Sequence, residues 1–586
     1  MDDVTMEHPL NAVAEMWLAE FQAALETGGV AQVAALFAGE CHWRDILAFT
    51  WNLHTTSGAA AIAQRLTSSL SRVAPRGFTL AAGRALPRRV ERAGVAVIEA
   101  IFTFETIVGP CNGVVRLVPE NGSLRAWTLM TALDDIRGHE DPANGRRWQN
   151  VDWKRNFGGE NWLDRRNKAR LYADRDPAVL VVGAAQAGLT IAARLALLGV
   201  DTLVIDREAR IGDSWRRRYH ALTLHNETRV NHLPYMPFPR SWPVFIPKDM
   251  LANWFELYAE AMELNVWTRA ELTSGRWDEA AGCWDVVIAR GDGTERRMRP
   301  RHIVFANGVS TTAIMPDLPG LKSFSGVVRH SGDYGSGLDW QGRRVLVVGT
   351  GTSGHDVAQD LQVSGAAEVT LIQRSPTLVV SLKEAQAPYA LYDEDVAFED
   401  LDLLAIASPF PVYRRAHQRI TAKNRDADRE LLQGLERRGF RLTSGAEGTG
   451  WQIMYQTRGG GYYFDAGCSQ LVVDGKVGLI QYADIERFGP EGAIMRDGSV
   501  RPADLIVLAT GYEGQAESAR RLLGDAVGDR MGPVWGFDEE GELQGMWRPT
   551  GQPGLWFHGG GLAQCRIFSK VLALQIKARE LGISSE

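Results

Sequence analysis

Two short glycine-rich turns, each lying between an apolar strand and a helical segment, constrain this chain more than any other feature. The first follows residues 178–182 and reads Gly183, Ala184, Ala185, Gln186, Ala187 and Gly188. The second follows residues 345–348 and reads Gly349, Thr350, Gly351, Thr352, Ser353 and Gly354. A helix that begins at such a turn offers free backbone N–H groups and the positive end of its dipole to a pyrophosphate. One such turn is a weak signal, but two predict a chain that binds two dinucleotides and passes electrons between them.

The residue that comes after the next strand differs between the two glycine turns. This difference indicates which nucleotide binds at each turn. After the first turn, the strand at residues 202–205 is followed by Asp206. Its carboxylate can accept hydrogen bonds from both hydroxyls of an adenosine ribose. Residues 369–372 are instead followed by Gln373 and Arg374, without an acid. A guanidinium there suits a ribose that carries a 2′-phosphate. We therefore expect FAD or NAD at the first turn and NADP at the second.

A third motif lies between the two turns. Residues 324–334 match the pattern FxGxxxHxxxY, with His330 and Tyr334 at its last two fixed positions. Here the chain resembles the flavin-containing monooxygenases, which take FAD and NADPH into separate domains. The resemblance covers roughly residues 170–586 and is specific in its motifs.

Further segments follow in the family's order. Their counterparts contact the flavin nucleotide, cross between the two nucleotide domains, or form a C-terminal turn against the flavin. They are residues 211–215 with Gly212 and Trp215, the crossing strands 304–308 and 505–512 with Gly511, and the turn 559–562.

The chain departs from the family's pattern at two positions. Ala185 replaces the usual middle glycine of the first turn and adds a methyl group near the pyrophosphate. Gly335 stands where the fingerprint commonly continues with Lys or Pro, which leaves the subclass open. Tyr334, in place of the Trp typical of Baeyer–Villiger enzymes, favours the flavin-containing and plant auxin-pathway-like branches.

The resemblance implies an FAD- and NADPH-dependent monooxygenase. In the family, NADPH reduces the flavin, oxygen adds to it as a C4a-peroxide, and one oxygen atom passes to a small organic substrate at nitrogen, sulfur or a carbonyl carbon. Relatives place an Asn near the flavin, for which Asn231 and Asn226 are equal candidates. His330 and Tyr334 complete the candidate catalytic set, with His330 expected to orient or to act at a hinge rather than as a base.

The fold class expected is α/β, with two Rossmann-like dinucleotide-binding domains, one inserted in the other, preceded by a small α+β cone domain. Residues 1–135 show helical spacing over 10–25, 30–37 and 58–70, and then alternating strands. The expected divisions are the cone at 1–135, a basic connector at 136–175 with Trp148, Trp153 and Trp162, the FAD domain at 176–335 and 481–586, and the NADP domain at 336–480.

The N-terminal segment loosely resembles polyketide-cyclase-like and nuclear-transport-factor-like cone domains. His42 and Asp45 are candidates to line a pocket inside such a cone. The alternative, which we favour, is that this domain packs on the oxygenase or mediates dimerisation, because a polar residue on a strand is usually only solvated.

Composition bounds the remaining alternatives. The 586 residues carry a net charge of −7 with interspersed charges, so nucleic acid is not an expected partner. The five cysteines lie far apart and form no CxxC, which disfavours a dithiol reductase and a metal site and fits a reducing compartment. Without a secretory signal or an apolar run of membrane-spanning length, a cytoplasmic protein is expected. An uncoupled NADPH oxidase, a two-dinucleotide reductase and a homodimer stay open.

Overall fold

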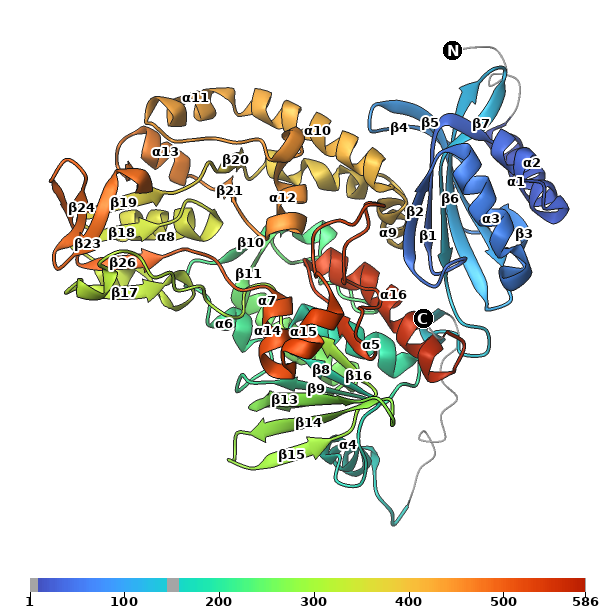
Figure 1. The fold of residues 1–586 in the computed structure, drawn as a ribbon, viewed down its shortest axis with the longest axis horizontal. Helices are drawn as coiled ribbons and strands as arrows, with labels where there is room; N and C mark the ends of the chain where they lie inside the picture. The colour runs from blue at the N-terminus through green and yellow to red at the C-terminus, as the bar shows by residue number, and fades with distance from the viewer. Residues whose placement is uncertain (1–8, 145–156, 585–586) are drawn as a thin grey trace.

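One seven-stranded sheet and two five-stranded parallel sheets organise the chain (Figure 1). The computed structural model describes residues 9–144 and 157–584. We call the parts built on these sheets the N-terminal unit, the first nucleotide unit and the second nucleotide unit. The expected α/β fold class is confirmed.

The N-terminal unit holds three helices against one face of its sheet, and the other face turns toward the rest of the molecule (Figure 1). Helix α1 ends at Gly28, whose left-handed backbone (φ 65°) closes the helix. The sheet runs in the order β2-β1-β7-β6-β5-β3, with β4 paired to β5. Its elements are α1 (Leu10–Thr27), α2 (Val30–Ala35), β1 (Phe37–Ile46), β2 (Leu53–Ser57), α3 (Ala59–Val73), β3 (Arg76–Leu80), β4 (Arg88–Arg92), β5 (Val95–Glu105), β6 (Pro110–Glu120) and β7 (Ser123–Leu133).

The three helices and strands β5, β6 and β7 lie where the periodicity predicts them, but β1, β2, β3 and β4 were not predicted. Strands β1 and β2 form a hairpin between α2 and α3, and β1 pairs in parallel with β7. The space between sheet and helices is filled by aromatic rings, among them Phe78 stacked on Phe104 with ring centroids 4.8 Å apart. The carboxylate of Asp45 lies fully buried, where it accepts hydrogen bonds from Thr131 and from the turn at Phe49 and Thr50.

The first nucleotide unit is a parallel sheet in the order β12-β9-β8-β16-β27. Its outermost strand comes from the far end of the chain, because β27 pairs with β16. Helix α16 packs on α5, so the C-terminal segment closes this unit. Its elements are β8 (Val179–Val182), α5 (Gln186–Leu197), β9 (Thr202–Asp206), α6 (Asp213–Arg216), β10 (Thr223–Glu227), β11 (Phe245–Pro247), α7 (Lys248–Ala261), β12 (Asn265–Thr268), β13 (Ala270–Asp278), β14 (Cys283–Arg290), β15 (Glu295–Met298), β16 (His302–Phe305), α14 (Gln515–Leu523), α15 (Asp525–Met531), β27 (Leu555–Phe557) and α16 (Leu562–Glu580).

The second nucleotide unit is a parallel sheet in the order β17-β26-β18-β19-β22. Helix α8 begins directly after β18, as α5 begins after β8. Strands β17 and β26 belong to this sheet although they lie outside residues 336–480. Its elements are β17 (Val327–His330), β18 (Arg344–Val348), α8 (Thr352–Val363), β19 (Glu368–Gln373), β20 (Leu378–Ser381), β21 (Tyr462–Asp465), α13 (Cys468–Val473), β22 (Gly478–Gln481), β23 (Ile485–Gly489), β24 (Gly492–Met495), β25 (Val500–Pro502) and β26 (Leu505–Leu508).

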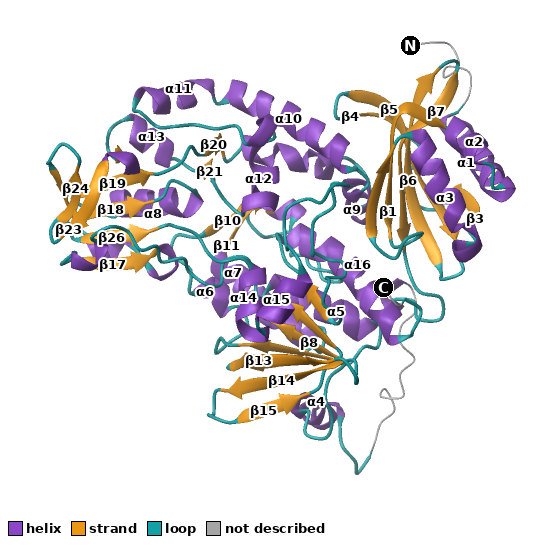
Figure 2. Ribbon diagram, in the orientation of Figure 1, coloured by secondary structure: helices purple, strands orange, loops and turns teal. Residues whose placement is uncertain are grey.

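A helical layer leaves the second unit between β20 and β21 and reaches the N-terminal unit (Figure 2). It consists of α9 (Phe398–Ile406), α10 (Phe410–Ala427), α11 (Arg429–Arg437) and α12 (Gly450–Arg458). Val412 of α10 packs against Val97 and Trp127 on the outer face of the N-terminal sheet. The layer therefore joins two units that are far apart in sequence.

The segment expected as a connector is described only in part. Trp148 and Trp153 lie outside the described residues. Trp162 opens helix α4 (Trp162–Leu171), whose start is capped by Asn161 and Asp164 in a capping box. The indole of Trp162 donates a hydrogen bond to Glu263, so this part of the segment lies along the first nucleotide unit.

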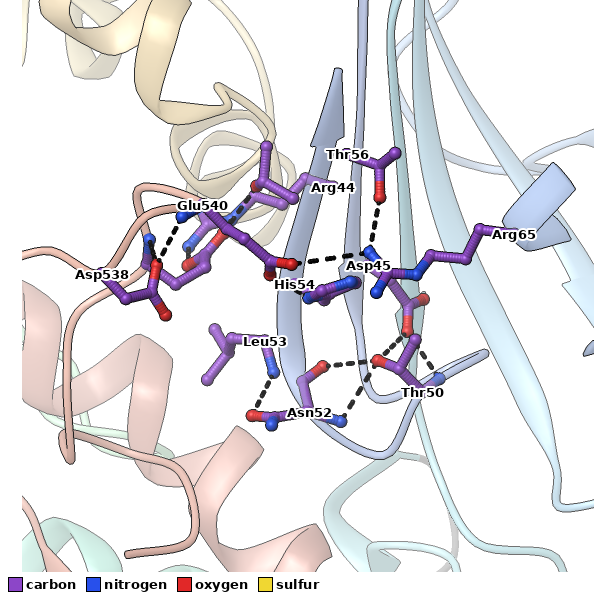
Figure 3. Close-up of polar contacts among 12 residues, drawn as sticks. Arg44, Asp45, Thr50, Asn52, Leu53, His54, Thr56, Arg65, Asp538 and Glu540 are labelled. Atoms are coloured by element: carbon purple, nitrogen blue, oxygen red, sulfur yellow. Dashed lines mark hydrogen bonds and ion pairs between the residues drawn. The ribbon is translucent and has the colours of Figure 1, made fainter. Parts of the chain in front are cut away.

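Buried ion pairs attach the N-terminal unit to the rest of the molecule. Arg44 of β1 binds both carboxylate oxygens of Glu542, at 2.8 and 2.6 Å, and Thr55 donates to the same carboxylate. The imidazole of His54 contacts Glu540 beside them (Figure 3). Burial lowers the pKa of His54 to about 4, so at neutral pH this contact joins a neutral imidazole to a carboxylate.

We expect Glu542→Gln to destabilise this interface strongly. The glutamate side chain is only 3% exposed, and its loss leaves Arg44 buried without a countercharge, which costs about 3–5 kcal/mol. Glu540→Gln is the matched control, because that side chain is 35% exposed and the change should cost no more than about 1 kcal/mol. Thermal and urea unfolding of both variants measure the difference, and equal losses would contradict the assignment.

Among residues 9–144 and 157–584, no helix combines the length and the apolar character needed to cross a bilayer.

Candidate functional site

The first glycine turn packs closely against its own strand, the following helix and the neighbouring strand. Gly183 has a φ of 109°, and a Cβ on it would lie 2.7 Å from the carbonyl oxygen of Ala306. A Cβ on Gly188 would lie 1.7 Å from the carbonyl oxygen of Gly183. Both positions therefore need glycine to let helix α5 pack against the turn. The first N–H groups of α5 have no intrahelical acceptor and point out of the turn.

The backbone also explains why Ala185 is tolerated. Its φ of −98° is extended backbone that any residue adopts. The equivalent Gly351 of the second turn has a φ of −80°, and a Cβ there would meet its nearest atom, the Tyr462 carbonyl oxygen, at 3.7 Å. Neither middle position needs a glycine for the fold.

Asp206, at the end of β9, lies beside the first turn. Its carboxylate accepts hydrogen bonds from the backbone N–H of Ala184, at 2.7 Å, and of Glu208, at 2.8 Å. A carboxylate has about four acceptor positions, so two remain for ribose hydroxyls.

Gln186 links the first turn to two other predicted flavin contacts. Its Oε1 accepts a hydrogen bond from the indole of Trp215 at 3.1 Å, and its Nε2 donates to the carbonyl of Gly560 at 3.4 Å. Gly212 precedes α6 and packs so closely on α7 that a Cβ would lie 2.5 Å from the carbonyl oxygen of Ala252. The structure thus brings together the first turn, the segment 211–215 and the C-terminal turn.

The second turn repeats the close packing of the first. A Cβ on Gly349 would lie 2.4 Å from the carbonyl oxygen of Ala509, and one on Gly354 would lie 2.2 Å from that of Gly349. The hydroxyls of Thr350 and Thr352 are bound within the protein, the first to Thr377 and the second to the carbonyl of Tyr462. Ser353 follows them at the start of α8.

Arg374 is exposed directly after β19, and the side chain of a second arginine, Arg441, contacts its main chain. Arg441 donates a hydrogen bond to the carbonyl of Arg374. Its backbone is held there by the buried Gln373, which exchanges two hydrogen bonds with the Arg441 main chain. Neither guanidinium has a carboxylate partner among the residues that the structure describes. Arg441 was not predicted, since nothing in the sequence joins it to Arg374.

His330 lies where the chain crosses between the two nucleotide units. Its Nδ1 accepts the N–H of Gly332, so its Nε2 carries the proton and donates to the carbonyl of Gly511 at 3.1 Å. Burial lowers the pKa of His330, which keeps the imidazole neutral. The crossing segments bind each other directly, because the N–H of Ile314 also donates to Gly511.

Tyr334 lies within the core of the second nucleotide unit. It is fully buried, and its hydroxyl donates to Asp360 of α8 at 3.0 Å. Burial and the neighbouring Asp360 raise the pKa of this phenol far above its ordinary value. These contacts give Tyr334 a part in the packing of α8.

The two candidate asparagines have different surroundings. Asn231 is buried, and its amide donates to the carbonyls of Asn226 and Glu227 in its own loop. The amide of Asn226 instead donates to the hydroxyl of Tyr389 at 3.0 Å. Tyr389 lines the cavity described next, so Asn226 stands directly behind a cavity wall.

A cavity of about 370 Å³ lies between the N-terminal unit, the helical layer and the C-terminal segment. Its walls are largely apolar and include Leu404, Phe410 and Phe568. Ala563 and Gln564, at the start of α16, also line it and follow directly on the turn 559–561. The cavity therefore extends to the predicted flavin contacts of the first nucleotide unit. No motif of the sequence predicts it, since its walls come from distant parts of the chain.

The model of the flavin-binding monooxygenase-like family matches residues 178–396. The chain is 30% identical over 351 residues to indole-3-pyruvate monooxygenase YUCCA1 of Oryza sativa subsp. japonica, covering 60% of this chain and 80% of that protein. It is 28% identical over 344 residues to the probable indole-3-pyruvate monooxygenase YUCCA3 of Arabidopsis thaliana, covering 58% of this chain and 74% of that protein.

Two solved structures share the fold of the nucleotide units. One is cyclohexanone monooxygenase with bound epsilon-caprolactone, at a TM-score of 0.51 and 18% identity, covering 69% of this chain and 88% of that one. The other is OTEMO in complex with FAD and NADP, at a TM-score of 0.51 and 17% identity, covering 70% of this chain and 87% of that one.

Proposed function

The chain belongs to the flavin-binding monooxygenase-like family, and from this premise we propose that it is an FAD- and NADPH-dependent enzyme that transfers one oxygen atom from O2 to a small organic substrate. The observation that carries the proposal is the pair of strand–turn–helix units in one chain, each with glycines at positions where a Cβ would strike the backbone. The transfer goes to nitrogen, to sulfur or to a carbonyl carbon.

The residues of the first nucleotide unit fit FAD. The turn at 183–188 and the N-terminus of α5 would hold the pyrophosphate, and Asp206 has acceptor positions left for the ribose. Gln186 places Trp215 and the turn 559–561 against that site. When bound, FAD supplies the ring that takes hydride from NADPH and reacts with O2.

The residues of the second nucleotide unit fit NADPH. The turn at 349–354 and the N-terminus of α8 would hold its pyrophosphate. Arg374 and Arg441 offer two exposed guanidiniums to the 2′-phosphate, which is the feature that separates NADPH from NADH. The short crossing segments at His330 and Gly511 would let the two units move relative to each other.

The test is a two-stage reaction of the purified yellow protein. Without oxygen, NADPH should bleach the flavin absorbance and NADH should do so far more slowly. When oxygen and a sulfide, amine or ketone are then admitted, oxygenated product should form. Release of hydrogen peroxide with every substrate would instead favour the uncoupled oxidase. A dithiol reductase receives no support, because the five cysteines are buried and unpaired.

We expect His330→Asn to lower the rate of flavin reduction by NADPH without changing the pH dependence of that rate. The substitution weakens two hydrogen bonds at the crossing, each of which contributes about 1 kcal/mol. Because the lowered pKa keeps His330 neutral above about pH 6.5, wild type and variant should give parallel pH profiles in stopped-flow measurements. An inflection near neutral pH that the variant lacks would make His330 a base.

A further inference from the structure

We propose that the N-terminal unit forms one wall of the substrate site, and that this site takes an uncharged, mainly apolar molecule with one hydrogen-bonding group. The proposal rests on the proposed function, since it names the substrate class of that oxygenase and the cavity in which the substrate binds. It also assigns a role to the N-terminal unit that the nucleotide units do not require.

The cavity is built by three parts of the molecule. Leu53 of β2 and Ala93, after β4, come from the N-terminal unit. The helical layer, together with residues 388–392 that lead into it, supplies residues of α9, α10 and α12. The C-terminal segment supplies residues between Phe537 and Phe568. A volume of about 370 Å³ lies within the roughly 300–1,000 Å³ that holds one small organic ligand.

Every charged side chain on these walls has an opposite charge within 4 Å. The pairs are Arg44–Glu542, Arg92–Glu99, Arg92–Glu394, Arg116–Glu99 and Arg419–Glu91. An ionised substrate would need a free countercharge, because a buried charge without a partner is strongly unfavourable. The walls that the structure describes offer none, so the site is matched to an uncharged molecule.

Three polar groups on the walls lack a hydrogen-bond partner within the described chain. They are the imidazole of His417, for which no hydrogen bond is found in that part of the chain, and the amide oxygen of Gln452 and the indole N–H of Trp547, which are both fully enclosed. His417 is only 6% exposed, and burial lowers its pKa to about 4, so it is neutral. Buried polar groups are almost always paired, which indicates that a polar group of the ligand pairs with the imidazole of His417.

Trp547 adds an apolar surface for the rest of the ligand. Its ring stacks on Phe568 with centroids 4.0 Å apart, and both line the cavity. Its φ of 59° is in the left-handed region, which a bulky residue adopts only where the surrounding structure imposes it.

The N-terminal unit also fixes a wall that it does not itself supply. The last carbonyls of α9 have no intrahelical donors. Arg44 donates to the carbonyl of Ile406 at 2.7 Å, and Arg116 donates to that of Leu404 at 3.2 Å. A partly buried and a fully buried cation thus cap the C-terminal end of α9, where the helix dipole favours positive charge. Leu404 and Ile406 line the cavity, so the capping positions them.

Two hairpin turns of the N-terminal unit provide a matched pair of variants. Ala93 (φ 51°) and Asn121 (φ 52°) each open a two-residue turn that a glycine completes. Ala93 lines the cavity, whereas Asn121 is exposed and does not. Ala93→Phe should place a ring inside the cavity, and Asn121→Phe should add the same ring elsewhere.

The probes are para-methylthiobenzyl alcohol and para-methylthiobenzoate, which carry the same sulfur and ring and differ in charge. Binding to the flavin-loaded full-length protein is measured by tryptophan fluorescence and calorimetry at neutral pH. We expect the benzoate to bind about tenfold or more weakly than the alcohol. Ala93→Phe should weaken alcohol binding by about tenfold or more, and Asn121→Phe by less than about twofold.

Equal binding of the two probes, or no binding of the alcohol, would overturn the substrate class. Unchanged alcohol binding by Ala93→Phe would overturn the N-terminal wall. The rate of flavin reduction by NADPH, measured in all three proteins without a probe, keeps the proposed function separate. If NADPH does not reduce the flavin, the proposed function fails whatever the probes do. If reduction is normal throughout, only the binding results decide this inference.

Discussion

Gly188→Val is expected to yield protein that purifies without bound flavin. A Cβ at this position would lie 1.7 Å from the carbonyl oxygen of Gly183, so helix α5 must move away from the turn that would hold the pyrophosphate. A shift of this kind costs several kcal/mol, and each 1.4 kcal/mol weakens binding about tenfold. The flavin-to-protein absorbance ratio measures the loss, with circular dichroism to check that the chain is folded.

The same substitution in the second turn provides the comparison. Gly354→Val, with a Cβ 2.2 Å from the carbonyl oxygen of Gly349, should keep its flavin and lose reduction by NADPH. Gly351→Ala should keep both properties, because its Cβ meets no atom closer than 3.7 Å. Loss of flavin from Gly354→Val and not from Gly188→Val would show that the two nucleotides are assigned the wrong way round.

The second large effect is expected from Arg374→Ala combined with Arg441→Ala. Hydrogen bonds to a charged group contribute about 1.5–3 kcal/mol, so the preference for NADPH over NADH should fall by about 10- to 100-fold. Each single variant should lose part of this preference, since the guanidinium of Arg441 contacts the main chain of Arg374. The ratio of kcat/KM values for the two nucleotides measures it.

Arg425→Ala is the control for general loss of positive charge. Arg425 is also exposed, but it lies on α10. The Arg425→Ala variant should keep the wild-type preference for NADPH over NADH and the wild-type flavin content. A double variant at 374 and 441 that still prefers NADPH would refute the placement of the 2′-phosphate.

Local patterns in the sequence predict the nucleotide units well, because each glycine turn, its strand and its helix are neighbours along the chain. The family and the fold class are confirmed, and β8, β9, β18 and β19 lie within a residue or two of their expected positions. The roles of the individual site residues and the domain boundaries stay predictions. Tyr334 shows why: its place in the motif says nothing about its bond to Asp360.

Features that depend on distant contacts could not be predicted. Arg441 reaches Arg374 only because Gln373 holds its backbone, and no spacing rule connects them. The cavity forms only when the N-terminal sheet, the helical layer and α16 meet. The ion pair between Arg44 and Glu542 lies where these parts meet, and it joins residues from near the two ends of the chain. Sequence patterns carry no record of such contacts.

The central claim is that electrons from NADPH are used to place one atom of O2 in an organic product. The most direct test supplies isotopically heavy O2, NADPH and para-methylthiobenzyl alcohol, and follows the sulfoxide by mass spectrometry. The account predicts one heavy oxygen atom in each product molecule and one NADPH consumed for it. Product oxygen that comes from water, or NADPH consumed with hydrogen peroxide as the only oxygen product, would contradict it.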